Sequence, residues 1–145
     1  MIVRPGAQYD VPHIVNAAVR FAADAYPHDP CDEGHIAGVV MHAIEADDGL
    51  VAVLETDQLV FAGCFLGCVG PNPLTGRPEC AEILIWVEPK FRGRGGLLKD
   101  YAEAWARAKH CHSMALAHPE ALGRAGKVFE AWGYTPSERW LRKVL

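Results

Sequence analysis

The sequence predicts one α/β (α+β) domain over residues 1–145, in which helices cover both faces of a mixed β-sheet. Four segments carry apolar residues at helical spacing, apolar runs with β-branched residues lie between them, and glycines and prolines separate the segments. The length is usual for one domain, and 50% hydrophobic with 22% charged residues is typical of a globular protein. Packing these segments into layers gives the expected order β-α-α-β-β-β-α-β-α-β.

Prolines and helix-capping residues set the ends of the expected helices and strands in the first third of the chain. Pro5 ends the first strand, and Asp10 is expected to N-cap the first helix, which tolerates Pro12 because its first turn needs no N–H donor. The loop at residues 26–30 contains two prolines and cannot continue that helix, and Asp32 begins the second one. The expected strands are residues 2–4, 50–54, 59–69, 80–87, 113–117 and 139–144, and the expected helices are residues 9–25, 32–46, 95–110 and 119–132.

Turn-forming residues likewise delimit the central strands. Asp47 to Gly49 ends the second helix, and the two apolar runs that follow, joined by residues 55–58, are typical of an antiparallel hairpin. A loop rich in glycine and proline, residues 70–78, leads to a third apolar run that Glu88 and Pro89 end. A helix then begins near Gly95, so a buried strand leads into a helix through glycines.

The composition excludes several classes of function. The formal charge is −4, so the chain lacks the basic character expected of a protein that binds nucleic acid or an anionic membrane, and neither partner is expected. The opening Met-Ile-Val-Arg-Pro lacks the features of a signal peptide, which predicts a cytoplasmic protein. The chain has five cysteines but no Cys-x-x-Cys pair, and His110 and His112 have no third ligand at a suitable spacing. The sequence therefore predicts no metal site.

The segment from Arg92 to Gly96 is the strongest chemical signal. A helix start presents unpaired N–H groups and the positive end of its dipole, glycines allow close approach of an anion, and arginines add charge-assisted hydrogen bonds. No Lys-Ser/Thr follows, as a P-loop requires, and no acidic partner lies about twenty residues on, as a dinucleotide fingerprint requires. The pattern predicts a pyrophosphate site for a ligand other than ATP or NAD; the alternative is a tight turn with solvated arginines.

The stretch from Ala81 to about Lys109 resembles the central motif of the GNAT superfamily of acyl-CoA-dependent N-acyltransferases. In that motif a strand ending in valine is followed by proline and by Arg-x-x-Gly-x-Gly/Ala at a helix start; Arg92, Gly93 and Gly95 match, and the last position is Leu97. The resemblance implies a mostly antiparallel central sheet and acetyl-CoA as the acyl-donor cosubstrate. It implies cofactor contacts at Ile85, Trp86, Val87, Arg92, Gly93, Arg94, Gly95, Gly96 and Leu97.

The C-terminal piece is similar to the end of the same family, in which Asn and Ala precede a Tyr-Glu-x-x-Gly-aromatic run. The matching residues are Ala125, Glu130, Gly133 and Tyr134, whereas Leu122 stands at the Asn position and Phe129 at the position of the usual tyrosine acid. Phe129 cannot donate a proton.

Glu82 is the expected general base, because the family often places a carboxylate on the strand before the motif. The alternative is a rim carboxylate without a special pKa. Tyr134 and Ser113, with His112, are the candidates for the missing acid.

The resemblance implies direct transfer of an acetyl group to an amine of a small molecule or a protein, by a chain that could form a homodimer. The loop from Asp24 to Glu33 borders the acceptor site in the family, and its acidic residues would attract a cationic amine or, alternatively, cap helices. The alternative function is a catalytically impaired CoA-binding or structural interaction protein with this fold. A phosphate- or nucleotide-binding regulator that uses the same helix start is a third possibility.

Overall fold

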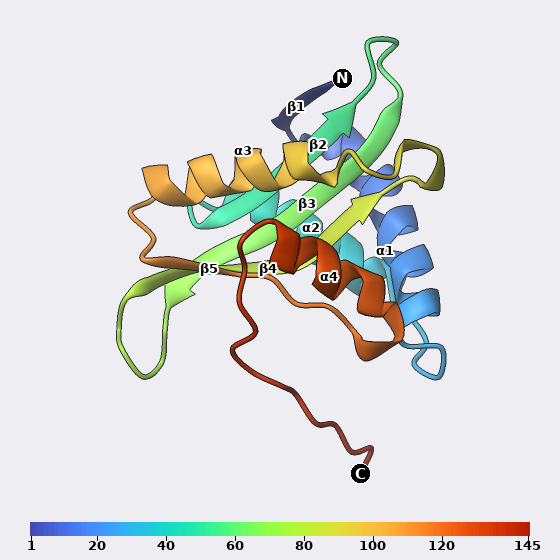
Figure 1. Ribbon diagram of the computed structural model, residues 1–145. Coiled ribbons are helices and arrows are strands. Elements are labelled where there is room, and N and C mark those ends of the chain that lie inside the picture. The colour runs from blue at the N-terminus through green and yellow to red at the C-terminus, as the bar shows by residue number, and fades with distance from the viewer.

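The computed structural model describes residues 1–145 and contains one five-stranded sheet between two pairs of helices (Figure 1). The strands are β1 (Ile2–Pro5), β2 (Gly49–Glu55), β3 (Phe61–Pro71), β4 (Pro78–Val87) and β5 (Ser113–Ala115). The helices are α1 (Val11–Ala25), α2 (Glu33–Glu45), α3 (Gly95–Ala108) and α4 (Gly123–Ala131), with short 3₁₀ turns at Gln8–Asp10, Pro89–Phe91 and Glu120–Leu122. No helix is both long and apolar enough to cross a membrane.

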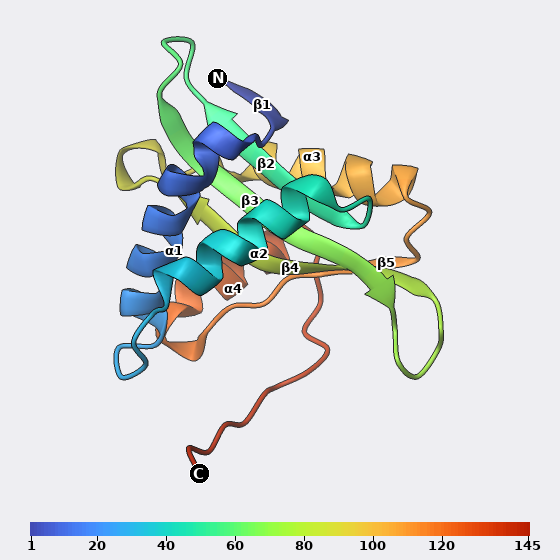
Figure 2. The same cartoon turned by 180° about the vertical axis from the view of Figure 1, so that it is seen from behind.

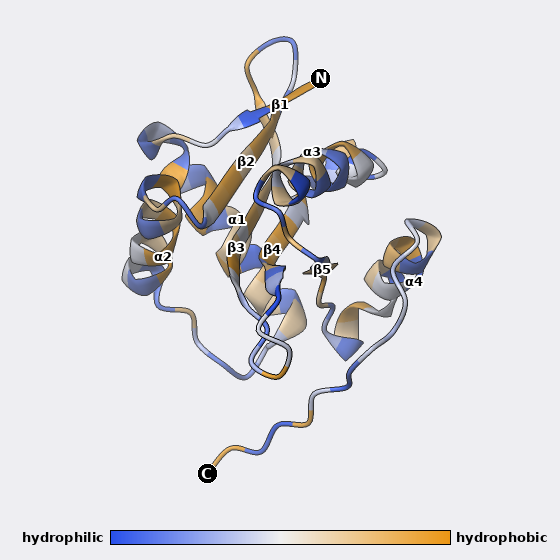
Figure 3. Ribbon diagram, turned by 90° about the vertical axis from the view of Figure 1, so that its left-hand side faces the viewer, coloured by the Kyte–Doolittle hydropathy of each residue, from blue (hydrophilic) through white to orange (hydrophobic).

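The strands lie in the order β1-β2-β3-β4-β5, with antiparallel pairing among the first four and parallel pairing between β4 and β5. Helices α3 and α4 lie on one face of the sheet, and α1 and α2 cover the other face (Figure 2). Seen along the sheet, the apolar strands lie between the two helical layers (Figure 3). The expected mixed, mostly antiparallel sheet with helices on both faces is confirmed.

Alternating side chains divide the interior into two cores. The core under α1 and α2 contains Leu84 and Trp86 of β4, whereas Ile85 and Val87 pack toward the core under α3. Successive side chains of a strand point to opposite faces, so four consecutive residues fill both cores. The end of β4 is therefore fixed from both sides before the chain enters the turn to α3.

A bulge at Ile83 distorts β4. Leu66 of β3 pairs with Leu84, whereas the next residue, Gly67, pairs with Glu82, so Ile83 is one extra residue in β4. Bulges bend a strand and end its regular pairing. The pairing of β4 with β5 stops at Ala81, opposite Ala115, and the outer edge of β4 beyond that point has no strand beside it.

Helix α2 begins with a side-chain cap. Asp32 has an extended backbone, and its carboxylate accepts a hydrogen bond from the His35 N–H at 2.9 Å. We expect Asp32→Ala to lower the free energy of unfolding by about 1 kcal/mol, because one N–H of the first turn loses its acceptor. Chemical denaturation measures the loss, with the exposed Asp47→Ala as a control that should change little. Equal losses in both variants would contradict the capping role.

Asp10 stands at the N-cap position of α1, as predicted, but its side chain does not cap the helix. Its backbone is helical and its side chain makes no capping bond; instead the buried carboxylate accepts hydrogen bonds from Arg4 and from the Ala7 N–H. An ion pair with Arg4, six residues earlier, takes the place of the expected cap. The last helix also starts later than expected, at Gly123, because a 3₁₀ turn precedes it.

The expected final strand at residues 139–144 does not form. Gly133 has a φ of +93°, Pro136 offers no N–H to a ladder, and the segment leads away from the sheet to an exposed end (Figure 1). Arg139 pairs with Glu120, and Arg142 pairs with Asp29 at 2.6 Å, so the segment is held by ion pairs to loops. The β5 edge that could have received it pairs over only three residues, all with β4.

Candidate functional site

The turn between β4 and α3 has the geometry of an anion site. Gly93 has a φ of +90°, a left-handed conformation that favours glycine. The N–H groups of Gly93, Gly95 and Gly96 have no backbone or side-chain acceptor, whereas those of Arg94 and Leu97 donate to carbonyls of the same turn. Three free donors thus lie at the positive end of a 14-residue helix, with no side chain of their own to obstruct an anion.

Two exposed arginines extend from this turn. Neither Arg92 nor Arg94 forms a hydrogen bond or an ion pair, so all their donors are available. The Arg92 guanidinium lies over the Trp86 ring at 5.4 Å from its centroid. The Trp86 side chain is only 6% exposed and packs in the core under α1 and α2, so this residue could contact a cofactor only through its backbone.

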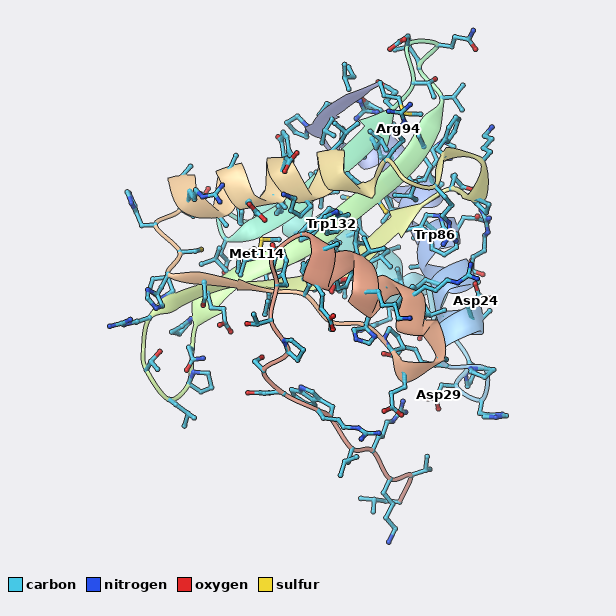
Figure 4. The ribbon with its side chains drawn as sticks, viewed as in Figure 1. Asp24, Asp29, Trp86, Arg94, Met114 and Trp132 are labelled. Carbon is cyan, nitrogen blue, oxygen red and sulfur yellow. The ribbon has the colours of Figure 1, made fainter.

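Trp132 lies against the start of α3. A Cβ built on Gly95 would be 3.3 Å from the Trp132 ring and 3.6 Å from Val87, so a side chain here would press on the ring. Figure 4 shows Trp132 between α3 and α4, with Arg94 at the turn above it. The sequence placed Trp132 at the end of the last expected helix, residues 119–132, but carried no signal for which helix start it would cover.

The separation of β4 from the chain beyond β5 forms the second part of the site. The Glu82 carboxylate spans the two segments and accepts a hydrogen bond from the Ala117 N–H at 3.0 Å. Beyond this bridge the backbone of Ile85 to Val87 has β3 on one side and no strand on the other. An extended ligand could pair with that free edge, as a peptide does in β-augmentation.

Glu82 has the electrostatics of a base that works near neutral pH. Its side chain is half-buried, and burial raises the pKa of its carboxyl to about 7, while the N–H groups of Ala117 and Ile85 lower it only in part. A carboxylate with such a pKa is half ionised at neutral pH and can accept a proton from an ammonium group.

The structure brings Ser113 and Tyr134 together but separates them from Glu82. Both line a groove of about 660 Å³ between β5 and the ends of α3 and α4, and Glu82 is not among its lining residues. Ser113 donates to Glu79 at 2.8 Å, and Tyr134 donates to Glu103 at 3.1 Å. Burial, followed by the charge of Glu103, raises the pKa of Tyr134, so this hydroxyl holds its proton more tightly than an ordinary tyrosine.

Two C-terminal positions that depart from the family pattern carry apolar side chains. Phe129 is 7% exposed and packs its ring against Trp132 and His118. Leu122 occupies the N-cap position of α4 and forms no side-chain capping bond. Neither side chain offers a polar atom to a ligand.

Acidic side chains in the loop between α1 and α2 already bind other parts of the protein. Asp32 caps α2, and Asp29 pairs with Arg142, so two of its carboxylates already have partners. Tyr26 and Asp29 also line a cavity of about 400 Å³. Asp24 and Asp29 lie on the α1 side of the molecule (Figure 4), where Asp24 forms no ion pair.

The family model described as the acetyltransferase (GNAT) family matches residues 14–134, so the chain belongs to this family of acetyltransferases. No curated protein matches it. Among solved structures, the aminoglycoside N-acetyltransferase AAC(6')-Iy in complex with CoA is 20% identical, with a TM-score of 0.79 over 99% of this chain and 93% of that chain.

The same enzyme in complex with a bisubstrate analogue, CoA-S-monomethyl-acetylneamine, is 23% identical, with a TM-score of 0.76 over 99% of this chain and 97% of that chain. A transcriptional regulator from Bacillus halodurans C-125 is 15% identical, with a TM-score of 0.80 over 99% of this chain and 98% of that one. At these identities the likeness establishes the fold alone.

Proposed function

We propose that this protein binds acetyl-CoA and transfers its acetyl group directly to an amine of a small molecule or a protein. One observation carries the proposal: three unpaired glycine N–H groups at the start of α3 lie next to the free backbone edge of β4. A pyrophosphate needs the first feature and a pantetheine arm can use the second. The CoA complexes of AAC(6')-Iy, which has the same fold, support the choice of ligand.

The donors present at the start of α3 suit the phosphates of this cofactor. Gly93, Gly95 and Gly96 would bind the pyrophosphate through their N–H groups, and Arg92 and Arg94 would add charge-assisted hydrogen bonds. The backbone of residues 85–87 would pair with the pantetheine amides. Bound acetyl-CoA would supply a thioester, whose carbonyl carbon is open to attack by an amine.

Glu82 would remove the proton from the acceptor amine, directly or through a water molecule. Its pKa of about 7 makes the carboxylate available at neutral pH, and its place beside the free edge of β4 puts it next to the expected thioester. A thiol has a pKa of about 8.5, so a departing thiolate is a weak base and needs less help from an acid than the amine needs from a base. Ser113 and Tyr134, which already donate to carboxylates, would be less important.

Replacing Arg92 tests the cofactor site. We expect Arg92→Ala to raise the Kd for acetyl-CoA about 10- to 100-fold, because charge-assisted hydrogen bonds to the pyrophosphate are lost. Calorimetric titration measures the change. Arg77→Ala removes the same charge from the hairpin at the opposite end of β4 and serves as the matched control. Equal affinities of the Arg92→Ala and native proteins would contradict the proposal.

A CoA-binding protein without transferase activity is the second candidate function. The buried Phe129 favours it, because this side chain cannot donate a proton at the position of the family's usual acid. Release of free thiol from acetyl-CoA in the presence of a panel of amines separates the two candidates. Tight CoA binding with no amine-dependent thiol release would support the second.

A further inference from the structure

The Trp86 ring supports two arginines from distant parts of the chain. Arg20 of α1 has its guanidinium carbon 5.0 Å from the ring centroid, and Arg92 of the glycine turn has its own at 5.4 Å. The ring is held in the core, and Figure 4 shows it beside α1. The electron-rich face of an indole attracts a guanidinium, so both side chains have a preferred resting place.

Glu88 holds only one of these two arginines. Both of its carboxylate oxygens lie 2.9 Å from Nη1 of Arg20, and Oε1 also accepts a hydrogen bond from Trp86 Nε1 at 3.3 Å. The Glu88 N–H donates to the carbonyl of Ala62 in β3, which fixes this residue to the sheet. Arg20 therefore supplies the counter-charge for the one carboxylate that directly precedes the turn.

Arg92 forms no pair with that carboxylate. It is four residues from Glu88, rests on the same indole, and forms no ion pair of its own. Without Arg20, the partly buried Glu88 charge would lack a partner, and Arg92 is a cation on the same ring that could pair with it. An arginine paired with Glu88 would have to break that pair before binding a phosphate.

We propose that Arg20 is a positioning residue for the cofactor site: by neutralising Glu88 it keeps Arg92 on the Trp86 ring and available to the pyrophosphate. Arg20 acts through Arg92 and need not touch the cofactor. The inference rests on the proposed function, because it assumes that Arg92 binds acetyl-CoA. The inference predicts that replacing Arg20 changes the affinity for acetyl-CoA, although Arg20 lies on α1, on the opposite face of the sheet from α3.

Titration calorimetry of a set of variants with acetyl-CoA tests the inference. We expect Arg20→Met to raise the Kd roughly fivefold and Arg20→Lys to raise it less. The double variant Arg20→Met with Glu88→Gln should have a Kd within about twofold of the native value, because the competing carboxylate is gone. In an Arg92→Ala background, Arg20→Met should cause no further loss. Thermal unfolding of each variant establishes that it folds.

The outcomes separate this inference from the proposed function. Arg20→Met could raise the Kd for acetyl-CoA equally in the native and Arg92→Ala backgrounds, or Glu88→Gln could fail to reverse the rise. Either result would show that Arg20 has a structural role and would overturn only the inference. Failure of the native protein to bind acetyl-CoA would overturn both. Loss of affinity that needs Arg92 and is relieved by Glu88→Gln would support both, since a merely structural Arg20 would show neither dependence.

Discussion

Replacing Glu82 by glutamine is expected to lower kcat for amine acetylation by about 100-fold or more, with the Kd for acetyl-CoA nearly unchanged. The amide has the shape of the carboxylate but cannot accept the proton of the amine, and general base catalysis contributes factors of about 10² to 10⁴. Steady-state rates with calorimetric affinities measure the two effects separately. Equal loss of both would mark Glu82 as a structural residue that holds Ala117.

The pH dependence gives an independent check on the same residue. Glu82 must be ionised to act as a base, and burial raises its pKa to about 7, so kcat/KM should fall as the pH drops below that value and level off above it. In Glu82→Gln this dependence should be absent. Glu45→Gln, an exposed change on α2, is the matched control and should keep the native profile. A native profile without a group near pH 7 would exclude Glu82 as the base.

Replacing Arg4 by methionine is expected to lower the free energy of unfolding by about 3 to 5 kcal/mol, because it leaves two buried carboxylates without a counter-charge. Arg4 bonds both oxygens of Asp10, at 2.8 and 2.9 Å, and both oxygens of Glu55, at 3.1 Å. The side chains of Asp10 and Glu55 are 4% and 11% exposed. Denaturant unfolding measures the loss, with the exposed Arg124→Met as control. A loss below 1 kcal/mol would contradict this role.

Lowering the pH should narrow the difference in unfolding free energy between the native protein and Arg4→Met. Burial by itself would raise the pKa of Asp10, but hydrogen bonds from Arg4 and from the Ala7 N–H outweigh it and bring the pKa below its ordinary value. The contribution of Asp10 is therefore present above its unfolded pKa, about 3.9, and is lost as the pH falls through the lower folded value. Below about pH 4 the native protein should lose more stability than Arg4→Met.

Local sequence predicted the features that depend on local chemistry. Apolar spacing, prolines and glycines located α1, α2 and α3, and the cluster of Arg92 with three glycines located the turn with its free donors, because helix starts and turns depend mainly on adjacent residues. The two strands that follow α2 were found for the same reason.

Features that depend on distant partners could not be predicted. Ile83 is an extra residue only relative to the register of β3, and Asp10 is held by Arg4, which also binds Glu55, rather than by its own helix. Residues 139–144 have the composition of a strand, but a strand also needs a partner edge, which no local pattern specifies. The cover of Gly95 by Trp132 is a packing outcome of the same kind.

The bulge at Ile83 gives the proposed pantetheine site an unusual tolerance to mutation. Beyond the bulge β4 has no strand on its outer side, so main-chain groups are exposed there, and every amino acid except proline carries the same pair of groups. Side chains at Ile85 and Val87 are then free to change within the limits of core packing, while recognition by the main chain persists. A substitution scan across these positions should find proline as the one residue type that abolishes binding, so this part of the binding site is inherited through strand geometry rather than through residue identity.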